Sequence, residues 1–266
     1  MYALHEQLAY APAADATSVE QLTIIEGRYE ARLAANAAEI ESALRLRHVV
    51  FNVELADDTN ADDIEQDAFD LVCRHLIVVD RETDQTVGTY RLNSFETAGA
   101  AEGFYSHGEF SIEDLPTDVL ASGVEVGRAC IAAEHRNTKV LYLLWKALAR
   151  FMQISKKRYL FGCCSIFTRD PLVGEKAFHQ LASAGHFHEW LRVEPRRNAL
   201  YLGPVSEIER SPVELPSLFN MYLRIGSKVC GPPIIDADFG TIDFFVVFDR
   251  ESMTDKCRKT FFDGIG

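Results

Sequence analysis

The sequence lacks the patterns that mark membrane-spanning, secreted, disulfide-bonded and zinc-binding proteins. Its longest apolar runs, such as residues 244–248, are far shorter than the roughly 20 residues of a membrane-spanning helix. The chain does not open with a basic stretch followed by an apolar run, as a secretory signal does. The six cysteines include no CxxC pair, so we expect neither a disulfide framework nor a zinc site, and no metal. These absences predict a protein of the reducing cytoplasm, with peripheral association at the inner membrane left open.

Positive charge is scarce and unevenly placed. The chain has 27 Lys and Arg against 40 Asp and Glu, a net charge of −13, which argues against a nucleic-acid partner. Residues 54–70 contain eight acids and no base, whereas residues 135–169 contain eight bases and no acid. The basic stretch is either a solvated helix face or a docking surface for an anionic partner, and the sequence leaves both open.

The hydrophobic pattern predicts one continuous α/β domain over residues 28–266, after a loose N-terminal arm at 1–27. We find no internal repeat and no long linker. Strands are expected at 28–33, 75–80, 86–92, 124–131, 159–167 and 241–249, and helices at 36–51, 138–155, 171–184 and 215–225.

The first predicted helix carries an arginine among apolar residues. Asn36 with Glu39 three residues later is the signature of a capping box, and Leu44 and Phe51 share one helical stripe. Arg47 lies in the middle of that stripe. An arginine on an apolar face needs a buried partner or lines a cleft.

The order of the predicted elements resembles the GNAT (acyl-CoA N-acyltransferase-like) fold, a mixed central sheet flanked by helices. Five segments go further than the order of elements: LRHVVF at 46–51, FDLVCRHLIVVDRETDQTVGTYRL at 69–92, EVGR at 125–128 with Arg136, RYLFGCCS at 158–165, and LRIGSKVCGPPIIDADFGTIDFF at 223–245. They are similar to the hemolysin-like branch of that superfamily, which includes the ornithine–acyl carrier protein N-acyltransferases of ornithine lipid synthesis.

This resemblance implies an acyltransferase that moves a long acyl chain from acyl carrier protein to the α-amine of an amino acid, most often L-ornithine. The product would be a lyso-ornithine lipid or another N-acyl amino acid. The acceptor, the chain length and 3-hydroxylation are left open.

The chain also resembles, more distantly, the acyl-homoserine lactone synthases, through Arg47 with Phe51, Arg91, and the pair Glu125 and Arg128. It lacks tryptophan in the acidic segment, which counts against a synthase that uses S-adenosylmethionine. A third alternative is an inactive GNAT module that binds acyl carrier protein, and retention of these charged residues weighs against it.

The resemblance implies that Glu125 and Arg128 are catalytic. A carboxylate takes the proton from the ammonium group so that a neutral amine attacks the thioester, and strand-edge amides near residues 128–130 stabilise the oxyanion. A regular strand would point residues 125 and 128 to opposite faces, but Gly127 permits a bulge that re-aims both. An ion pair that braces the sheet is the alternative for Glu125.

The substrate carboxylate would be held by Arg47, Arg91 or Arg128, with Phe51 beside it.

The resemblance puts the donor-binding loop at residues 136–141, which contain no glycine. Side chains there keep the backbone from closing on the pyrophosphate of coenzyme A. Arg136 and Lys139 instead suit the single phosphate of the 4′-phosphopantetheine that acyl carrier protein presents, and no permanently bound cofactor is expected. Lys156, Lys157 and Arg158 would extend a basic surface toward the acidic carrier.

Two further features have competing interpretations. Cys163 and Cys164 invite a covalent acyl-enzyme hypothesis, but they lie in an apolar strand with no evident base, which favours core cysteines. The acids at 54–70 would attract a cationic amino acid, or they form a solvated, mobile loop, which we favour.

Overall fold

The computed structural model describes residues 20–55, 63–99, 103–200, 202 and 212–263. The chain forms two compact units, the first of residues 1–102, 126–157 and 259–266, and the second of residues 103–125 and 158–258. Strand β5 (Gly123–Ile131) begins in the second unit and ends in the first. The expectation of a single domain over 28–266 stays a prediction.

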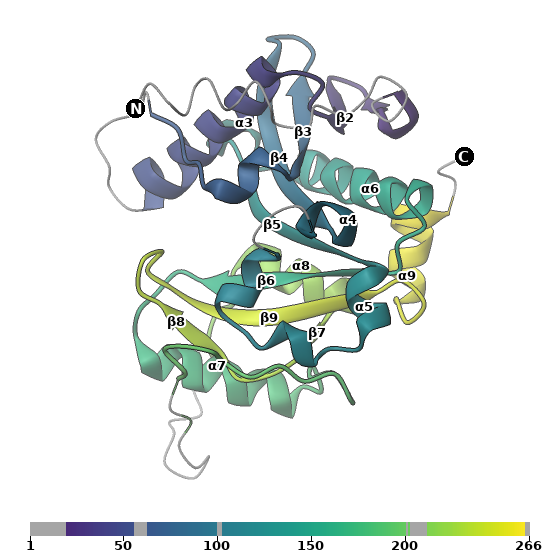
Figure 1. Ribbon diagram of the computed structural model, residues 1–266. Helices are drawn as coiled ribbons and strands as arrows, with labels where there is room; N and C mark the ends of the chain where they lie inside the picture. The colour runs from purple at the N-terminus through teal and green to yellow at the C-terminus, as the bar shows by residue number, and fades with distance from the viewer. Residues whose placement is uncertain (1–19, 56–62, 100–102, 201, 203–211, 264–266) are drawn as a thin grey trace. The chain divides into compact units, whose positions relative to one another are not determined.

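The first unit is built on an antiparallel sheet in the order β1 (Ile24–Glu26), β2 (Tyr29–Leu33), β3 (Arg74–Asp80) and β4 (Gln85–Ser94), followed by the end of β5 (Figure 1). All of these strands except β1 were predicted. The expectation of a loose arm is wrong at its C-terminal end, because residues 24–26 pair with residues 29–31 around a turn at Gly27. The rest of that arm, residues 1–19, lies outside the described residues.

Helix α3 (Ala37–His48) begins as predicted. Asn36 Oδ1 accepts a hydrogen bond from the Glu39 amide at 3.0 Å, while the Glu39 carboxylate accepts from the Ala35 amide at 2.8 Å. The helix ends earlier than expected and continues as a π-helical segment, η2 (Val49–Glu54). Phe51 lies on that segment, partly buried against a small cluster that includes Cys130.

Helices α3 and α6 (Thr138–Ile154) cover opposite faces of this sheet (Figure 1). The α3 residues Ala43 and Leu44 pack with Ile77 of β3. The neighbouring residue Val78 points the other way and pairs with Gly88 of β4, where an added Cβ would meet Leu144 of α6 at 3.4 Å. The predicted helix at 138–155 is thus confirmed, with its apolar face on the sheet.

The second unit contains the start of β5, then β6 (Tyr159–Ile166), β9 (Thr241–Asp249), β7 (Lys228–Val229) and β8 (Ile234–Asp236). Strand β5 runs parallel to β6 at residues 123–125, and β6 is antiparallel to β9 along its whole length. Strands β5, β6 and β9 were predicted. Strands β7 and β8 were not, because two and three residues are too few to show a hydrophobic period.

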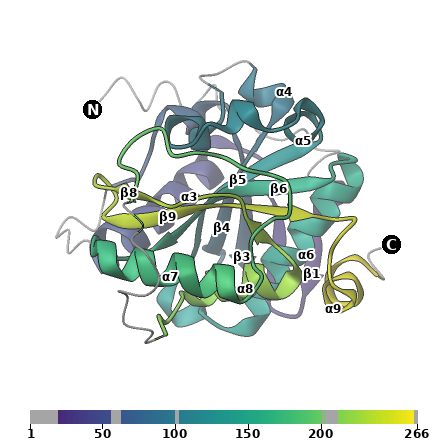
Figure 2. The same ribbon diagram turned by 90° about the horizontal axis from the view of Figure 1, so that it is seen from below.

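Helices α7 (Pro171–Ser183) and α8 (Ser217–Ile225) cover one face of this second sheet (Figure 2). Their buried side chains join Cys164 and Phe244 in one core, and α8 ends, as predicted, at Gly226 with φ 107°. Short helical segments of this unit are η4 (Tyr105–Gly108), η5 (Ile112–Asp114), α5 (Thr117–Ala121) and α9 (Asp255–Cys257). Phe104 and Phe110 pack edge-on or tilted against Phe161 and Phe245, which belong to β6 and β9.

The remaining short segments belong mainly to the first unit. They are η3 (Ala68–Leu71), α4 (Phe95–Ala98), η6 (Ala133–His135) and η8 (Arg258–Phe262). The ring of Phe261 in η8 lies 5.3 Å from that of Tyr142 and 6.0 Å from that of Trp145, which fixes this segment against α6.

Candidate active site

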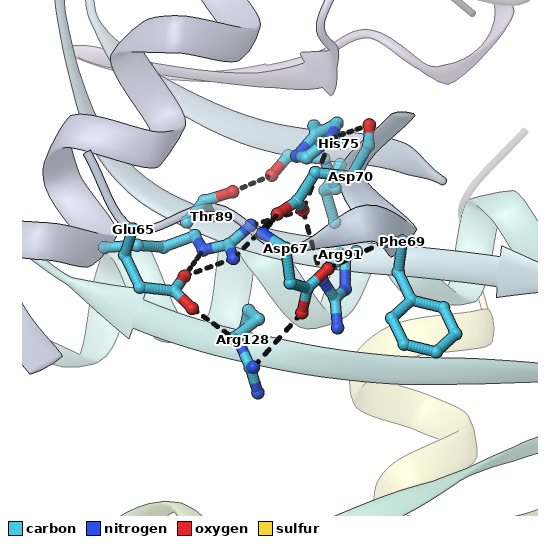
Figure 3. Close-up of polar contacts among 10 residues, drawn as sticks. Glu65, Asp67, Phe69, Asp70, His75, Thr89, Arg91 and Arg128 are labelled. Atoms are coloured by element: carbon cyan, nitrogen blue, oxygen red, sulfur yellow. Dashed lines mark hydrogen bonds and ion pairs between the residues drawn. The ribbon is translucent and has the colours of Figure 1, made fainter. Parts of the chain in front are cut away.

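The first unit holds a buried network of three arginines and three acids, which we call the arginine–acid network. The arginines come from three elements, α3, β4 and β5, whereas the acids all come from residues 65–70 just before β3. Figure 3 shows Arg91 and Arg128 pointing toward Asp67. The members are Arg47, Arg91, Arg128, Glu65, Asp67 and Asp70.

Arg47 is the most deeply buried arginine of this network. It is 0% exposed, and its two terminal nitrogens donate to Asp70 at 2.6 and 3.1 Å, while Nε donates to Glu65. Burial acts to raise the pKa of Asp70, but the cations of Arg47 and Arg91 outweigh it and hold that pKa well below its usual range. The sequence predicted that Arg47 needs a buried partner, and in the structure Asp70 and Glu65 are its partners. The expectation that Arg47 holds a substrate carboxylate stays a prediction, and the contacts shown here are with Asp70 and Glu65.

Arg91 and Arg128 complete the network nearer to solvent. Arg91 Nη1 donates to Asp67 at 2.6 Å and to Asp70 at 3.2 Å, and its guanidinium lies over the Phe69 ring at 5.5 Å. Arg128 donates to Glu65 at 3.1 Å and to Asp67 at 3.2 Å. The side chain of Arg128 is 12% exposed, against 5% for Arg91 and 1% for Arg47. Of the three arginines, Arg128 is the one best placed to meet a ligand.

The interpretation of the acidic segment as a solvated loop is wrong for Glu65, Asp67 and Asp70, while residues 56–62 lie outside the described residues. Asp70 is fully buried and Glu65 is 10% exposed at its side chain. His75 packs beside Asp70, and burial lowers its pKa to about 4, so it is neutral at pH 7. Three cations therefore face three anions, a balance that a search for isolated motifs does not reveal.

Strand β5 is distorted where the sequence allowed a bulge. The left-handed φ of 52° falls on Arg128 itself, the residue after Gly127. A non-glycine residue there is strained, and such strain often accompanies a functional site.

Glu125 lies in the second unit and is 6% exposed. Its carboxylate accepts hydrogen bonds from the Tyr105 amide at 2.8 Å and from the amide and hydroxyl of Ser106, both at 2.7 Å. These three donors fix the position of the carboxylate. These contacts favour an anchor that holds η4 in place, and the catalytic role of Glu125 stays a prediction.

A second group of side chains that the sequence did not bring together lies in the same unit. Glu109, Cys163 and Asp243 come from the end of η4, from β6 and from β9, and their polar atoms all lie within 4.8 Å of one another. The thiol of Cys163 donates to Glu109 Oε2 at 3.2 Å. We call these three residues the acid–thiol cluster. In the sequence, only Asp243 could have pointed to this cluster, because it is a charged residue inside an otherwise apolar strand.

The electrostatics of this cluster disfavour a covalent role for Cys163. Burial and the nearby charges of Glu109 and Asp243 raise the pKa of the thiol well above its usual value, so the thiolate is suppressed. Cys164 points to the opposite face, where it is buried in the core under α7 and α8, as predicted. Burial and the charge of Asp243 also raise the pKa of Glu109 to about 7.

Glu109→Gln is therefore expected to raise the free energy of unfolding at pH 8 by about 3 kcal/mol. A carboxyl group whose pKa is raised from 4.5 to about 7 on folding binds more protons in the folded chain, so stability falls as the pH rises through that window. Urea unfolding of wild type and variant at about pH 5 and pH 8 measures this effect. The same pH dependence in both proteins would contradict a raised pKa of the buried Glu109 carboxyl group.

The expected docking surface at residues 156–158 stays a prediction, but two of its three members form ion pairs with acids of the same chain. Lys157 is 6% exposed, and its Nζ contacts Glu96 at 2.8 and 3.0 Å. Arg158 forms a bidentate pair with Asp249 at 2.9 and 2.7 Å. Lys156 alone is exposed. The stretch lacks acids in the sequence because its partners come from other segments of the chain.

The N-terminus of α6 retains exposed positive charge. Asn137 caps the helix and accepts from the amides of Lys139 at 3.0 Å and Val140 at 3.2 Å. Arg136 and Lys139 are exposed, and Arg136 forms an ion pair with Glu54. A phosphate would therefore meet these side chains and would compete with Glu54 for Arg136.

No described helix combines the length and the apolar character needed to cross a membrane.

The family described as Acetyltransferase (GNAT) domain matches residues 46–146 of this chain. The chain is 33% identical over 253 residues to the L-ornithine N(alpha)-acyltransferase of Brucella abortus, with 86% of this chain and 87% of that protein covered. It is 31% identical to the enzyme of the same name from Rhodobacter capsulatus, with 87% and 93% covered.

Among solved structures, the acyl-homoserine lactone synthase LasI aligns with a TM-score of 0.47 at 10% identity, covering 89% of this chain and 96% of LasI. The N-acyl amino acid synthase FeeM from uncultured soil microbes aligns with the same TM-score at 9% identity, covering 88% and 96%. The GNAT fold predicted from the sequence is confirmed by the family match, together with the mixed sheet and its flanking helices.

Proposed function

Because the chain belongs to the L-ornithine N(alpha)-acyltransferase family and is a GNAT-fold N-acyltransferase, we propose that it transfers a long acyl chain to the α-amine of an amino acid. The donor is acyl carrier protein, and the preferred acceptor is L-ornithine. The observation that carries the proposal is the identity of 33% spread over 86% of the chain. The product is an N-acyl amino acid, the lyso form of an ornithine lipid.

The arginine–acid network supports an acceptor that carries a carboxylate. The Arg128 guanidinium is partly exposed and held from behind by Glu65 and Asp67. A planar guanidinium in fixed orientation suits bidentate pairing with a carboxylate. We assign Arg128 to the α-carboxylate of the acceptor, with Arg91 as a second candidate and Phe51 as an apolar neighbour.

The reaction is a direct transfer. The α-ammonium loses a proton, the neutral nitrogen attacks the thioester carbonyl, an N–C bond forms and the C–S bond breaks. The nitrogen then loses a second proton, which the departing pantetheine thiolate takes up. The amides at 128–130 suit the oxyanion, while the first proton passes to water or to Glu125. Direct attack fits a Cys163 that stays a thiol.

The decisive test uses purified protein, carrier protein charged with a long acyl or 3-hydroxyacyl chain, and a panel of amino acids. Mass spectrometry should detect N-acyl-ornithine as the main product. Absence of any acylated amino acid, or product formation only with S-adenosylmethionine, would rule the proposal out.

Acyl carrier protein is expected to be a better donor than acyl-CoA. The loop at 136–141 has no glycine, and Asn137 already occupies two amides at the start of α6. Exchanging the exposed Lys139 and Lys156 together for glutamate should lower kcat/KM for the charged carrier about tenfold at low salt, and less at high salt, because exposed charges are screened. Steady-state rates at two salt concentrations measure the change.

Two controls accompany this comparison. An acyl-pantetheine mimic, which lacks the carrier surface, should react equally with the variant and the wild type. Lys256→Glu makes the same change at an exposed lysine outside the basic stretch and should have no effect. Equal kcat/KM for acyl-CoA and the charged carrier would remove the basis for a carrier-protein donor.

A further inference from the structure

One face of the second unit's sheet carries polar side chains beyond its Phe161 and Phe245, unlike the face under α7 and α8. Cys163 and Ser165 alternate with buried apolar residues along β6 and are partly exposed. Asp243 pairs with Ser165 across the ladder and shares its face, as does Thr241 two residues before it on β9. Asp236 of β8 pairs with Thr241 and extends the same polar strip.

Two acceptors in this strip are buried without a hydrogen-bond partner among the described residues. They are Oε1 of Glu109 and Oγ1 of Thr241, and both residues are 1% exposed. A buried acceptor left unsatisfied costs about 1–3 kcal/mol. A folded chain tolerates this cost most readily where a ligand supplies the missing donors.

The charges around Glu109 indicate which kind of ligand this strip would bind. The nearby ionisable groups on β9 and β8 are Asp243 and Asp236, both of the same sign as Glu109. The groups from β6 and η4 are the Cys163 thiol and Tyr105, which act as hydrogen-bond donors. Buried carboxylates facing one another favour a cation between them.

We infer that Glu109, Asp243 and Thr241 form a subsite that binds the side-chain ammonium of the acceptor amino acid. This inference rests on the proposed function, which supplies the amino acid acceptor. An ammonium group has three N–H donors, and the subsite offers an acceptor on each of these three residues.

The occupant is the second amine and not the one that reacts. Paired acids hold an ammonium in its charged form, and a charged nitrogen has no lone pair for attack on a thioester. The geometry therefore selects a diamino acid, in which one amine is anchored while the other is acylated.

The test compares L-ornithine with L-norvaline, which has the same carbon chain but no side-chain amine. Wild type should prefer ornithine in kcat/KM, and Glu109→Gln should lower kcat/KM for ornithine by about 10²–10³, as expected when one member of a buried charge pair is removed. The rate with norvaline should change less than about threefold. Asp243→Asn should behave in the same way. Ornithine should also raise the melting temperature of the wild type but not of Glu109→Gln.

The matched control is Glu113→Gln, the same exchange at a half-exposed glutamate that pairs with Arg196. It should leave the ornithine preference intact. Equal losses with ornithine and norvaline in Glu109→Gln would make Glu109 a general base and overturn the subsite. So would a bound divalent metal whose chelation abolishes activity with both acceptors. If no amino acid is acylated, the proposed function fails. The subsite is then tested by melting temperature: it stands if ornithine raises that of the wild type but not that of Glu109→Gln, and it fails otherwise.

Discussion

Arg47→Ala is expected to lower the free energy of unfolding by about 3–5 kcal/mol, the usual loss when one member of a buried ion pair is removed. Arg47 is fully buried, and its removal leaves Asp70 without its bidentate partner and Glu65 without its Nε donor. Urea or thermal unfolding, followed by circular dichroism, measures the loss.

Arg45→Ala is the matched control for this prediction. It makes the same change in the same last turn of α3, at an arginine whose pairing with Glu41 is exposed. Such surface pairs contribute about 0.5 kcal/mol. Phe51→Ala should cost about 1–2 kcal/mol, because Phe51 is only partly buried. A loss at Arg47 no larger than that at Arg45 would mean that the network does not stabilise the fold.

The sequence predicted the long elements because their apolar residues repeat with a helix or strand period. The helix at 138–155 and the strands at 159–167 and 241–249 were placed within one residue at each end. Strands β1 and β8, with three residues each, are too short for a period to emerge. The π-helical turn at η2 also escaped prediction, because it changes the backbone hydrogen bonds but not the composition.

The candidate site was predicted in part, and the missing part has a physical reason. Arg47 was identified as an arginine that needed a partner, but the identity of that partner depends on how residues 65–70 fold back on α3. The ion pairs of Lys157 and Arg158 were missed for the same reason, since Glu96 and Asp249 are 61 and 91 residues away. Charge counted along a sequence does not show which charges meet in space.

Arg128→Ala is expected to lower kcat/KM for L-ornithine by about 10²-fold or more, the usual effect of removing one partner of a charge-assisted pair. Arg128 is the most exposed arginine of the network, and Glu65 and Asp67 fix its guanidinium in one orientation. Its φ of 52° shows that the strand is distorted at this residue. A guanidinium held in this way can pair with the α-carboxylate of an acceptor without losing much side-chain freedom.

The informative comparison substrate is putrescine, which keeps both amines of ornithine but has no carboxylate. Wild type should acylate it slowly, and Arg128→Ala should acylate it no more slowly than wild type, so that the preference for ornithine collapses. Arg128→Lys keeps the charge but loses the bidentate geometry and should fall between the two. Arg45→Ala, outside the network, should retain the full preference. A variant that loses activity equally toward ornithine and putrescine, while melting like the wild type, would exclude Arg128 as the carboxylate ligand. Arg91, the next most exposed arginine of the network, and the more deeply buried Arg47 would then be the remaining candidates.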